Sequence, residues 1–435
     1  MTNQLPRSLT LFSAVMLVVG NVVGAGIFTT AGMLAEEVSQ PAAFIGVWIL
    51  GGLLTLIGSL TYAELGAMFP RAGGDYQFIK EAYGPLAGFC LGWLGFMVIF
   101  PGSIAALSIA LVEHIPGLPE SISSSRWAAL PVVFLLGLLN YRSTRLATST
   151  QSIITVGSLL LLAGLIIGGA LTGNGNTHNF TTLPSTGFHF SGSAMIAVFF
   201  TYSGWFAAAY VGSEVIRPER NVPLALVLGT LTVTVLYTAV NAIYLYALPL
   251  NELRSAAGTN AAELTAAKLF GPKAAWLTGA AVLLAIASCI NASVMTGARV
   301  CYALAEDRIF PSALKRIHPR FSTPHTAVAA QTILAVIYVL AGSFEKILGY
   351  VVFAMLLSNI AAGIAHLKLR RSKPELQRPY KTLLAPIVPI LFAAAHAWFA
   401  FQIAADQPFT SLVGIGIVLT AVPVYLLRRR FSNQR

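Results

Sequence analysis

The chain has 435 residues, of which 56% are hydrophobic and only 10% are charged. A soluble globular domain carries about 25% charged residues, so this composition excludes a soluble enzyme or binding module and indicates a polytopic membrane protein. The cysteines Cys90, Cys289 and Cys301 lie within apolar segments and have no metal-ligand or disulfide spacing. Neither a metal ion nor a cofactor is therefore expected.

Twelve apolar segments approach or exceed the roughly 20 residues that a bilayer requires. They cover residues 8–35, 40–69, 84–113, 126–140, 147–172, 189–213, 221–249, 273–303, 325–343, 346–369, 381–402 and 409–429, the fourth and ninth being short. We predict an all-α polytopic membrane protein with 12 transmembrane helices in one domain, residues 1–435. No paired acids, histidine cluster or nucleophile–base arrangement lies within these spans, so an enzyme is not expected.

The basic residues are distributed unequally between the loops. With an even number of spans both termini lie on one side, which receives 21 of the 27 lysines and arginines; five fall on the other side, and Arg299 lies within the eighth span. Cytoplasmic loops carry the excess of basic residues. Both termini are therefore expected in the cytoplasm of a multi-pass protein of the inner (plasma) membrane. The net charge of +11 is topological, and a nucleic-acid partner is not expected.

The first span contains three glycines in seven residues, in the sequence GNVVGAGI at residues 20–27. Each glycine inside a helix costs about 1 kcal/mol relative to alanine. In lipid, a broken backbone persists only where it is buried in protein or lines a cavity. We predict two half-helices, the second presenting free N–H groups to an anion such as a carboxylate. The alternative is that the glycines only allow close helix packing.

A second polar interruption, FFTYSGW at residues 199–205, lies in the sixth span. It comes five spans after the first, so the two broken segments run in opposite directions. Paired broken helices at matching positions are typical of transporters built from inverted repeats with a midplane site. The predicted repeats are about 8–172 and 189–369, with extra helices at about 381–429.

Several motifs carry a resemblance to a known family. They are GAGIF at 24–28, YAEL at 62–65, PRAGGDY at 70–76, the segment 200–205, Glu214 with RPERNVP at 217–223, and KPELQRP at 373–379. In this order and spacing the chain resembles the amino acid/polyamine/organocation (APC) transporter superfamily, in the L-type amino acid transporter (LAT) branch and of bacterial type. The resemblance implies a LeuT-type fold of five plus five inverted repeats and two extra helices.

The resemblance also implies a function, which is secondary transport of small or medium neutral L-amino acids by a sodium-independent exchanger with alternating access. It places the substrate carboxylate at the backbone N–H groups of the first break and the ammonium at carbonyls that end the half-helices. Phe200 matches the gating aromatic of the family. The expected substrate-binding residues are Val22, Ala25, Gly26, Ile27, Phe200, Tyr202, Ser203 and Phe206.

The positions of the charged residues bear on the substrate. No Asp or Lys lies in the middle of any span, and Glu64, Glu113 and Glu214 sit at span ends. A cationic side chain at the midplane needs a buried acid partner, so neutral amino acids are favoured. Cationic amino acids or polyamines remain the alternative, because backbone carbonyls and aromatic rings also hold cations.

Ser158 in the fifth span departs from the family pattern, because many sodium-independent relatives have a lysine there. Ser158 is either a neutral packing residue in a simple exchanger or part of a Na⁺ site with oxygens from Ser288 or Ser293. Na⁺- or H⁺-coupled uptake is therefore the alternative to exchange.

Two further expectations concern the cytoplasmic side and the partners. Glu64, Asp75 and Glu214 are candidates for a cytoplasmic gate that latches basic residues. Animal members of the branch pair with a heavy-chain subunit through a cysteine between spans three and four. Residues 113–126 contain no cysteine, so no disulfide-linked heavy chain is expected. A non-transporting amino acid sensor is disfavoured because the tails are short.

Overall fold

The computed structural model describes residues 5–181, 192–256, 260–342 and 344–432. Within these residues the regular structure is helical, apart from isolated β-bridges between Leu9 and Val215 and between Ala72 and Val211. The predicted all-α class is therefore confirmed.

The helices follow the predicted spans. The first five spans are α1 (Leu11–Val22) with α2 (Gly26–Glu37), α3 (Pro41–Met68), α5 (Pro85–Leu94) continued through the π-helical turn η1 (Gly95–Ile99) into α6 (Phe100–Glu113), α8 (Leu130–Arg142) and α9 (Thr144–Thr172). The next five are α10 (Gly192–Thr201) with α11 (Ala207–Tyr210), α12 (Pro218–Ala247), α15 (Ala275–Glu306), α16 (His325–Ala341) and α17 (Phe344–Ser372). The last two are α18 (Ile387–Asp406) and α19 (Pro408–Ser432).

Length and apolar composition identify most of these helices as membrane spans. Among the described residues eight helices can cross a membrane by themselves, and the bent pair α1–α2 makes a ninth. Helices α8 and α16 and the interrupted pair α10–α11 are shorter. The structure confirms a polytopic helical membrane protein, while the number twelve stays a prediction.

Short helices occur where the sequence predicted loops. They are α4 (Asp75–Tyr83), α7 (Glu120–Ser123), α13 (Leu250–Arg254) and α14 (Ala261–Phe270). Helix α4 follows Gly73 and Gly74, whose φ angles of 108° and 50° favour glycine and turn the chain back into the bundle. The eleventh span begins at Ile387 and not at residue 381, because residues 383–386 form a turn.

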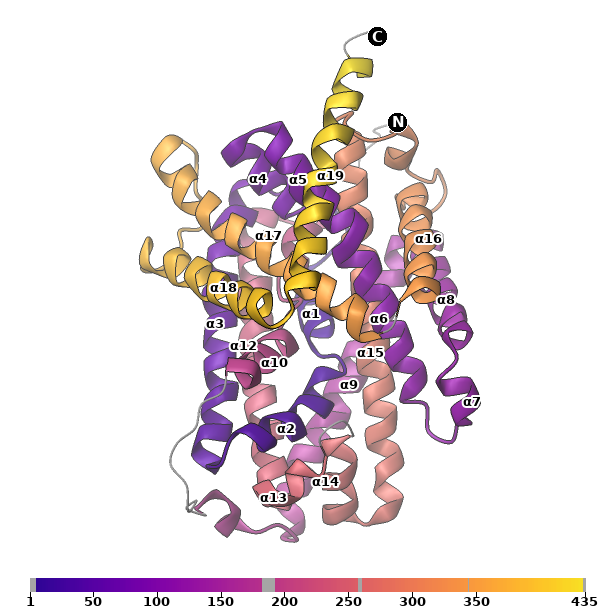
Figure 1. Cartoon of the computed structure of the whole chain (residues 1–435), viewed down its shortest axis with the longest axis vertical. Helices are drawn as coiled ribbons and strands as arrows, with labels where there is room; N and C mark the ends of the chain where they lie inside the picture. The colour runs from indigo at the N-terminus through magenta and orange to yellow at the C-terminus, as the bar shows by residue number, and fades with distance from the viewer. Residues whose placement is uncertain (1–4, 182–191, 257–259, 343, 433–435) are drawn as a thin grey trace.

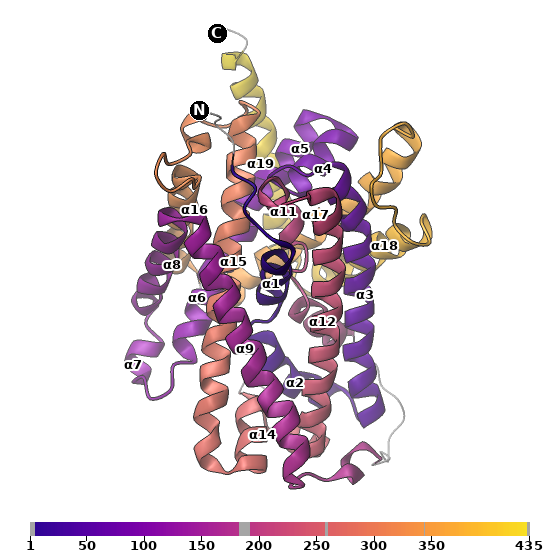
Figure 2. The same cartoon turned by 180° about the vertical axis from the view of Figure 1, so that it is seen from behind.

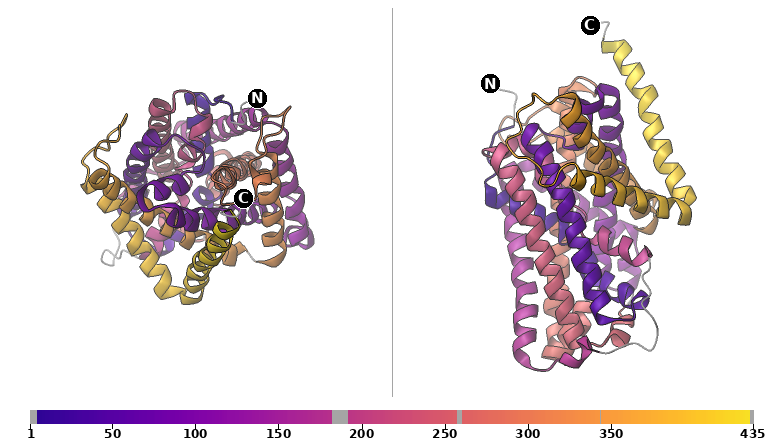
Figure 3. Two further views of the ribbon diagram at one scale, coloured as in Figure 1. Left: turned by 90° about the horizontal axis from the view of Figure 1, so that it is seen from above. Right: turned by 90° about the vertical axis from the view of Figure 1, so that its left-hand side faces the viewer.

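Helix α1 lies at the centre of the bundle, where it packs against α9, α12 and α15 (Figure 2). Helices α18 and α19 cover the outside, α18 against α3 and α17 and α19 against α5 and α17. Figure 3 shows α19 diverging from the body of the bundle. The chain before α1, helix α4 and the end of α19 lie towards one end of the molecule (Figure 1). We call this end the terminus face.

Backbone hydrogen bonds join three segments of the chain at the terminus face. The N–H groups of Ser8 and Leu9 donate to the carbonyl O of Glu214 at 2.9 and 2.8 Å, and Ile216 N–H donates to Leu9 O at 2.9 Å. Gly73 N–H donates to Tyr210 O at 3.0 Å. The segments before α1, before α4 and after α11 are therefore joined to one another.

Candidate functional site

The first span is broken as predicted, with a 41° bend between α1 and α2. The break falls after Val22, and α1 continues as a helix through Gly20. A Cβ at Gly20 would lie 2.1 Å from Thr155 Oγ1 and 2.3 Å from Ser288 Oγ. Gly20 therefore serves close packing, and Gly24 belongs to the break, so both interpretations of the glycines hold at different positions.

The start of α2 packs closely against the sixth span. A Cβ at Gly26 would lie 2.7 Å from Thr201 Oγ1, and the hydroxyls of Thr30 and Thr201 are 2.8 Å apart. The first N–H groups of a helix lack intrahelical acceptors and form its positive end. Among the described residues, the hydrogen bond that begins α2 runs from Phe28 N–H to Ala25 O, at 3.0 Å.

The sixth span is also interrupted, since the chain turns between α10 and α11. Gly204 has a φ of 100°, which favours glycine, and a Cβ there would lie 2.6 Å from Asn21 O. Asn21 Nδ2 donates to Gly204 O at 2.8 Å, and Cys289 Sγ donates to Asn21 O at 2.8 Å. The two predicted breaks therefore touch and are tied together. Sequence reasoning missed Asn21, although an amide beside Gly20 in an apolar span was a signal.

A tyrosine of α12 links the end of α1 to the end of α10, which are the first halves of the two broken spans. Tyr237 Oη lies 2.9 Å from Val22 O and 3.4 Å from Thr201 O. Its ring lies 4.9 Å from that of Tyr202, whose hydroxyl donates to Trp48 O at 3.0 Å. Val22 O keeps a second lone pair for another donor. Tyr237 gave no sequence signal, because tyrosines are common in apolar spans.

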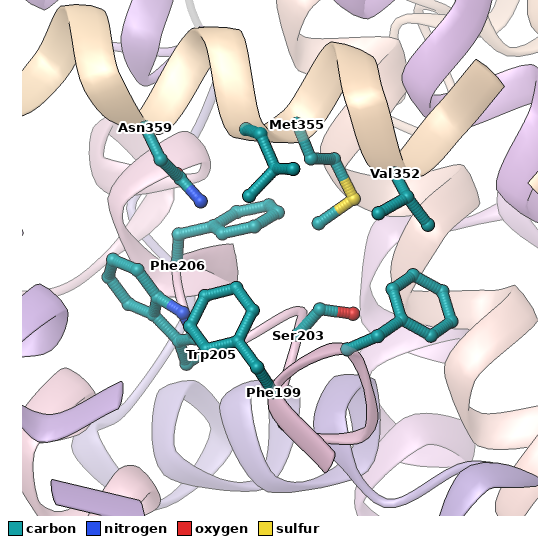
Figure 4. A pocket seen from close by; sticks show the side chains of 9 residues that line it. Phe199, Ser203, Trp205, Phe206, Val352, Met355 and Asn359 are labelled. Carbon is teal, nitrogen blue, oxygen red and sulfur yellow. The ribbon is translucent and has the colours of Figure 1, made fainter. Parts of the chain in front are cut away.

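A small cavity lies between the interrupted sixth span and α17 (Figure 4). Its lining residues are Phe199, Phe200, Ser203, Trp205, Phe206, Val352, Met355, Leu356 and Asn359. Of the expected substrate-binding residues it brings together Phe200, Ser203 and Phe206. The side chain of Tyr202 points to Trp48 instead, and the first-span residues are not part of this lining.

The sequence did not predict the α17 side of the cavity. The residues at 352, 355, 356 and 359 recur at the spacing of one helix face. In a span that is apolar all round, such a face cannot be told from one that meets lipid or another helix. Only Asn359 is polar, and it is 4% exposed.

The candidate ion-site serines lie in different surroundings. Ser288 Oγ is 2.8 Å from both Gln151 Nε2 and Thr155 Oγ1, beside Gly20. Ser158 Oγ is buried without a hydrogen-bond partner among the described residues. Ser293 lies five residues after Ser288, which is about 140° around the helix. No hydrogen bond that the structure describes joins any two of the three serines.

The polar cluster at Gln151 was not predicted. Gln151 Oε1 accepts from Asn291 Nδ2 at 2.7 Å, and Asn291 Oδ1 accepts from Asn140 Nδ2 at 2.7 Å. Side-chain amides of α8, α9 and α15 thus form a chain of buried hydrogen bonds.

The gate candidates each have partners near the terminus face. Glu214 accepts from Arg299 Nε at 2.6 Å and Nη2 at 2.9 Å, and both side chains are almost completely buried. Glu64 accepts from Arg370 Nε at 2.9 Å and Nη2 at 2.6 Å and from Thr382 N–H at 2.7 Å. Glu214 and Glu64 thus bind different partners. A lone arginine within an apolar span was the signal for Arg299.

Helix α4 is fastened to several spans. Tyr210 Oη donates to Asp75 Oδ2 at 2.7 Å. Lys80 Nζ pairs with Asp307 Oδ2 at 2.5 Å, and Lys373 Nζ pairs with Glu81 Oε2 at 3.2 Å. Helix α4 therefore connects the sixth span, the end of α15 and the segment after α17.

Asp75 gives a pH-dependent prediction. Burial raises the pKa of its carboxyl from 3.8 to about 6, although the hydroxyls of Tyr62 and Tyr210 lower it. The folded protein therefore binds this proton more tightly than the unfolded chain, so stability rises as pH falls through 6 towards 4. From pH 7.5 to 5.5 this group is expected to add about 1 kcal/mol to the free energy of unfolding.

The measurement is thermal unfolding in detergent across this pH range. Asp75→Asn is the control, because it removes the titrating group and is expected to flatten this part of the profile. Equal pH slopes for the wild type and Asp75→Asn would show that Asp75 does not titrate as described.

Paired broken helices beside a small cavity, within an all-helical membrane bundle, define the architecture of a secondary transporter. Residues 9–423 match the family model described as amino acid permease. The chain is 34% identical over 442 residues to Asc-type amino acid transporter 1 of Mus musculus, covering 97% of this chain and 81% of the relative. The chain therefore belongs to the amino acid permease family, which confirms the APC resemblance.

Two more relatives span most of the chain. It is 31% identical over 429 residues to the serine/threonine exchanger SteT of Bacillus subtilis (strain 168), covering 97% of each chain. It is 32% identical over 440 residues to large neutral amino acids transporter small subunit 2 of Homo sapiens, covering 97% of this chain and 80% of the relative. These relatives are transporters and not enzymes, as expected for this chain.

Proposed function

We propose that this protein is a sodium-independent exchanger of small or medium neutral L-amino acids that works by alternating access. The observation that carries this proposal is the uncharged cavity beside two joined helix breaks. Its lining combines apolar side chains with only Ser203 and Asn359 as aliphatic polar groups. A charged substrate side chain would be unpaired there, which is costly. The names of the relatives, which include a neutral amino acid transporter and an exchanger, support the same function.

We assign the two ends of the amino acid to the two breaks. The carboxylate binds the N–H groups of Ala25, Gly26 and Ile27 at the positive end of α2. The ammonium binds the carbonyls of Val22, Phe200 and Ser203. Among these, Val22 O already accepts from Tyr237 and Phe200 O accepts from Ser203 N–H at 2.9 Å, and each keeps one lone pair. Tyr202 holds the turn between α10 and α11 in place through its hydrogen bond to Trp48 O.

Independence from Na⁺ is supported by the cluster beside Gly20. The NH₂ group of Gln151 lies 2.8 Å from Ser288 Oγ and 3.3 Å from Thr155 Oγ1. An amide donor thus uses the hydroxyl oxygens that a cation would need as ligands. Ser158 is then a neutral packing residue of α9.

We infer the membrane topology from the distribution of basic residues and from the predicted inverted repeats. We place the terminus face in the cytoplasm, because the loops there carry most lysines and arginines. The inverted repeats extend over about 8–172 and 189–369, with α18 and α19 outside them. The protein works without a disulfide-linked heavy chain, because its cysteines lie at 90, 289 and 301, outside residues 113–126.

The test is uptake of radiolabelled L-alanine into proteoliposomes in Na⁺ or choline buffer. Vesicles preloaded with unlabelled L-alanine are compared with empty vesicles. We expect uptake at least about tenfold faster into preloaded vesicles, unchanged by choline, because return of the empty carrier limits net uptake. Na⁺-dependent uptake into empty vesicles would contradict exchange and favour a cation site near Ser158. Uptake of L-arginine or putrescine in place of L-alanine would contradict the neutral substrate.

A further inference from the structure

A tyrosine lies between the cavity and helix α4. Tyr62 of α3 is fully buried, and its hydroxyl donates to Asn359 Oδ1, which lines the cavity, at 3.1 Å. Its ring lies 4.8 Å from that of Trp205 at the cavity and 5.8 Å from that of Phe78 on α4. Tyr62 therefore contacts the cavity lining and α4 at once.

A second acceptor lies at the start of α4, the helix that Tyr62 contacts through Phe78. Asp75, at the start of α4, is 4% exposed, and its Oδ2 accepts from Tyr210. Its Oδ1 is buried and has no hydrogen-bond partner among the described residues. The Tyr62 side chain acts on the Asp75 carboxyl and lowers its pKa. A phenol carries one proton, so it can donate strongly either to Asn359 or to Asp75, but not to both.

The surroundings of Asp75 leave these hydroxyls as its main partners. Tyr62 from α3 and Tyr210 from α11 are the side chains that lower its pKa. Two cations on this side of the bundle pair with other acids, Lys80 with Asp307 and Arg299 with Glu214. A buried carboxylate depends strongly on each hydrogen bond that it accepts, because burial disfavours its charged form.

We propose that Tyr62 is a positioning residue that couples the cavity to α4, its hydroxyl alternating between Asn359 and the free oxygen of Asp75. When a ligand occupies or displaces the Asn359 amide, the hydroxyl turns to Asp75. Asp75 then accepts from two tyrosines and holds α4 more firmly against α3 and α11. When Asn359 is free, the hydroxyl returns to it and α4 is released more easily. The role of this coupling in transport rests on the proposed exchange cycle.

The test measures α4 directly and does not require transport. Hydrogen–deuterium exchange of a peptide covering residues 71–83 reports the opening of α4 in detergent-solubilised protein. Asn359→Leu removes the acceptor at the cavity, so the Tyr62 hydroxyl can be satisfied only by Asp75. We expect exchange of α4 about tenfold slower than in the wild type at pH 7.5, since a hydrogen bond to a charged group is gained.

The second variant decides whether Tyr62 carries the effect. Tyr62→Phe removes the hydroxyl, so adding Asn359→Leu to it should cause no further slowing. Near pH 5 the effect of Asn359→Leu should shrink to about twofold, because a protonated Asp75 gains less from a donor. A purely structural role of Asn359 would not produce this dependence on Tyr62 and on pH.

Tyr244→Phe is the matched control, because Tyr244 of α12 is equally buried and its hydroxyl has no partner among the described residues. Its α4 exchange should equal that of the wild type. Asn359→Ala replaces Asn359→Leu if the leucine variant does not fold. Unchanged α4 exchange in the Asn359 variants, or slowing that persists with Tyr62→Phe, overturns the proposal. Failure of alanine exchange alone leaves this result intact and bears only on the proposed function.

Discussion

Replacing Arg299 by methionine is expected to cost about 3–5 kcal/mol of stability and to abolish transport, because it leaves a buried carboxylate without its cation. The Arg299 and Glu214 side chains are 2% and 0% exposed, and the pair is bidentate, with distances of 2.6 and 2.9 Å. Arg299 Nη1 also donates to Met295 O at 3.0 Å. The pair joins α15 to the segment after α11, which in turn holds the chain before α1.

Thermal unfolding in detergent and L-alanine exchange measure the two effects. Adding Glu214→Gln to Arg299→Met should recover part of the lost stability, because the uncompensated charge is removed. Lys268→Met is the matched control, since Lys268 and Glu252 form a pair at 3.4 Å with both side chains about half exposed. Such a pair is worth at most about 1 kcal/mol. An Arg299→Met protein as stable as the Lys268→Met protein would refute the buried-pair argument.

Replacing Gly204 by alanine is expected to remove transport and to cost at least about 2 kcal/mol, through strain at a positive φ. The new Cβ would also lie 2.6 Å from Asn21 O, which is backbone and cannot rotate away. Either the turn of the sixth span or the end of α1 must therefore move. Both carry proposed ligands of the substrate ammonium, so exchange should fall even in protein that still folds.

Gly164→Ala is the control for this substitution. Gly164 lies in α9, and a Cβ there would meet nothing within 4 Å. Replacing a helical glycine by alanine should be neutral or stabilise by up to about 1 kcal/mol. Melting temperatures and L-alanine exchange rates are compared in the same lipid. Wild-type exchange by Gly204→Ala would mean that the two breaks are not a rigid unit.

The sequence identified the two helix breaks correctly because their cause is local. Glycines and polar residues weaken an apolar helix wherever it lies, and a membrane tolerates them mainly at a protected break or at a close helix contact. The sequence was less informative about which glycine breaks the helix. Gly20 and Gly24 look alike in the chain, and only the neighbours Thr155 and Ser288 show that Gly20 is a packing residue.

The sequence by itself determined the membrane class, the helical fold, the paired breaks and the family, since composition, apolar run length and ordered motifs are properties of the chain. The tertiary structure alone decided the partners. Asn21 meets Gly204 across 183 residues, and Tyr62 meets Asn359 across 297. Helices in a membrane bundle are apolar on every side, so no periodicity in the sequence marks the face that meets the cavity or another helix. That choice is made by packing between distant segments, which also sets α4 against the bundle.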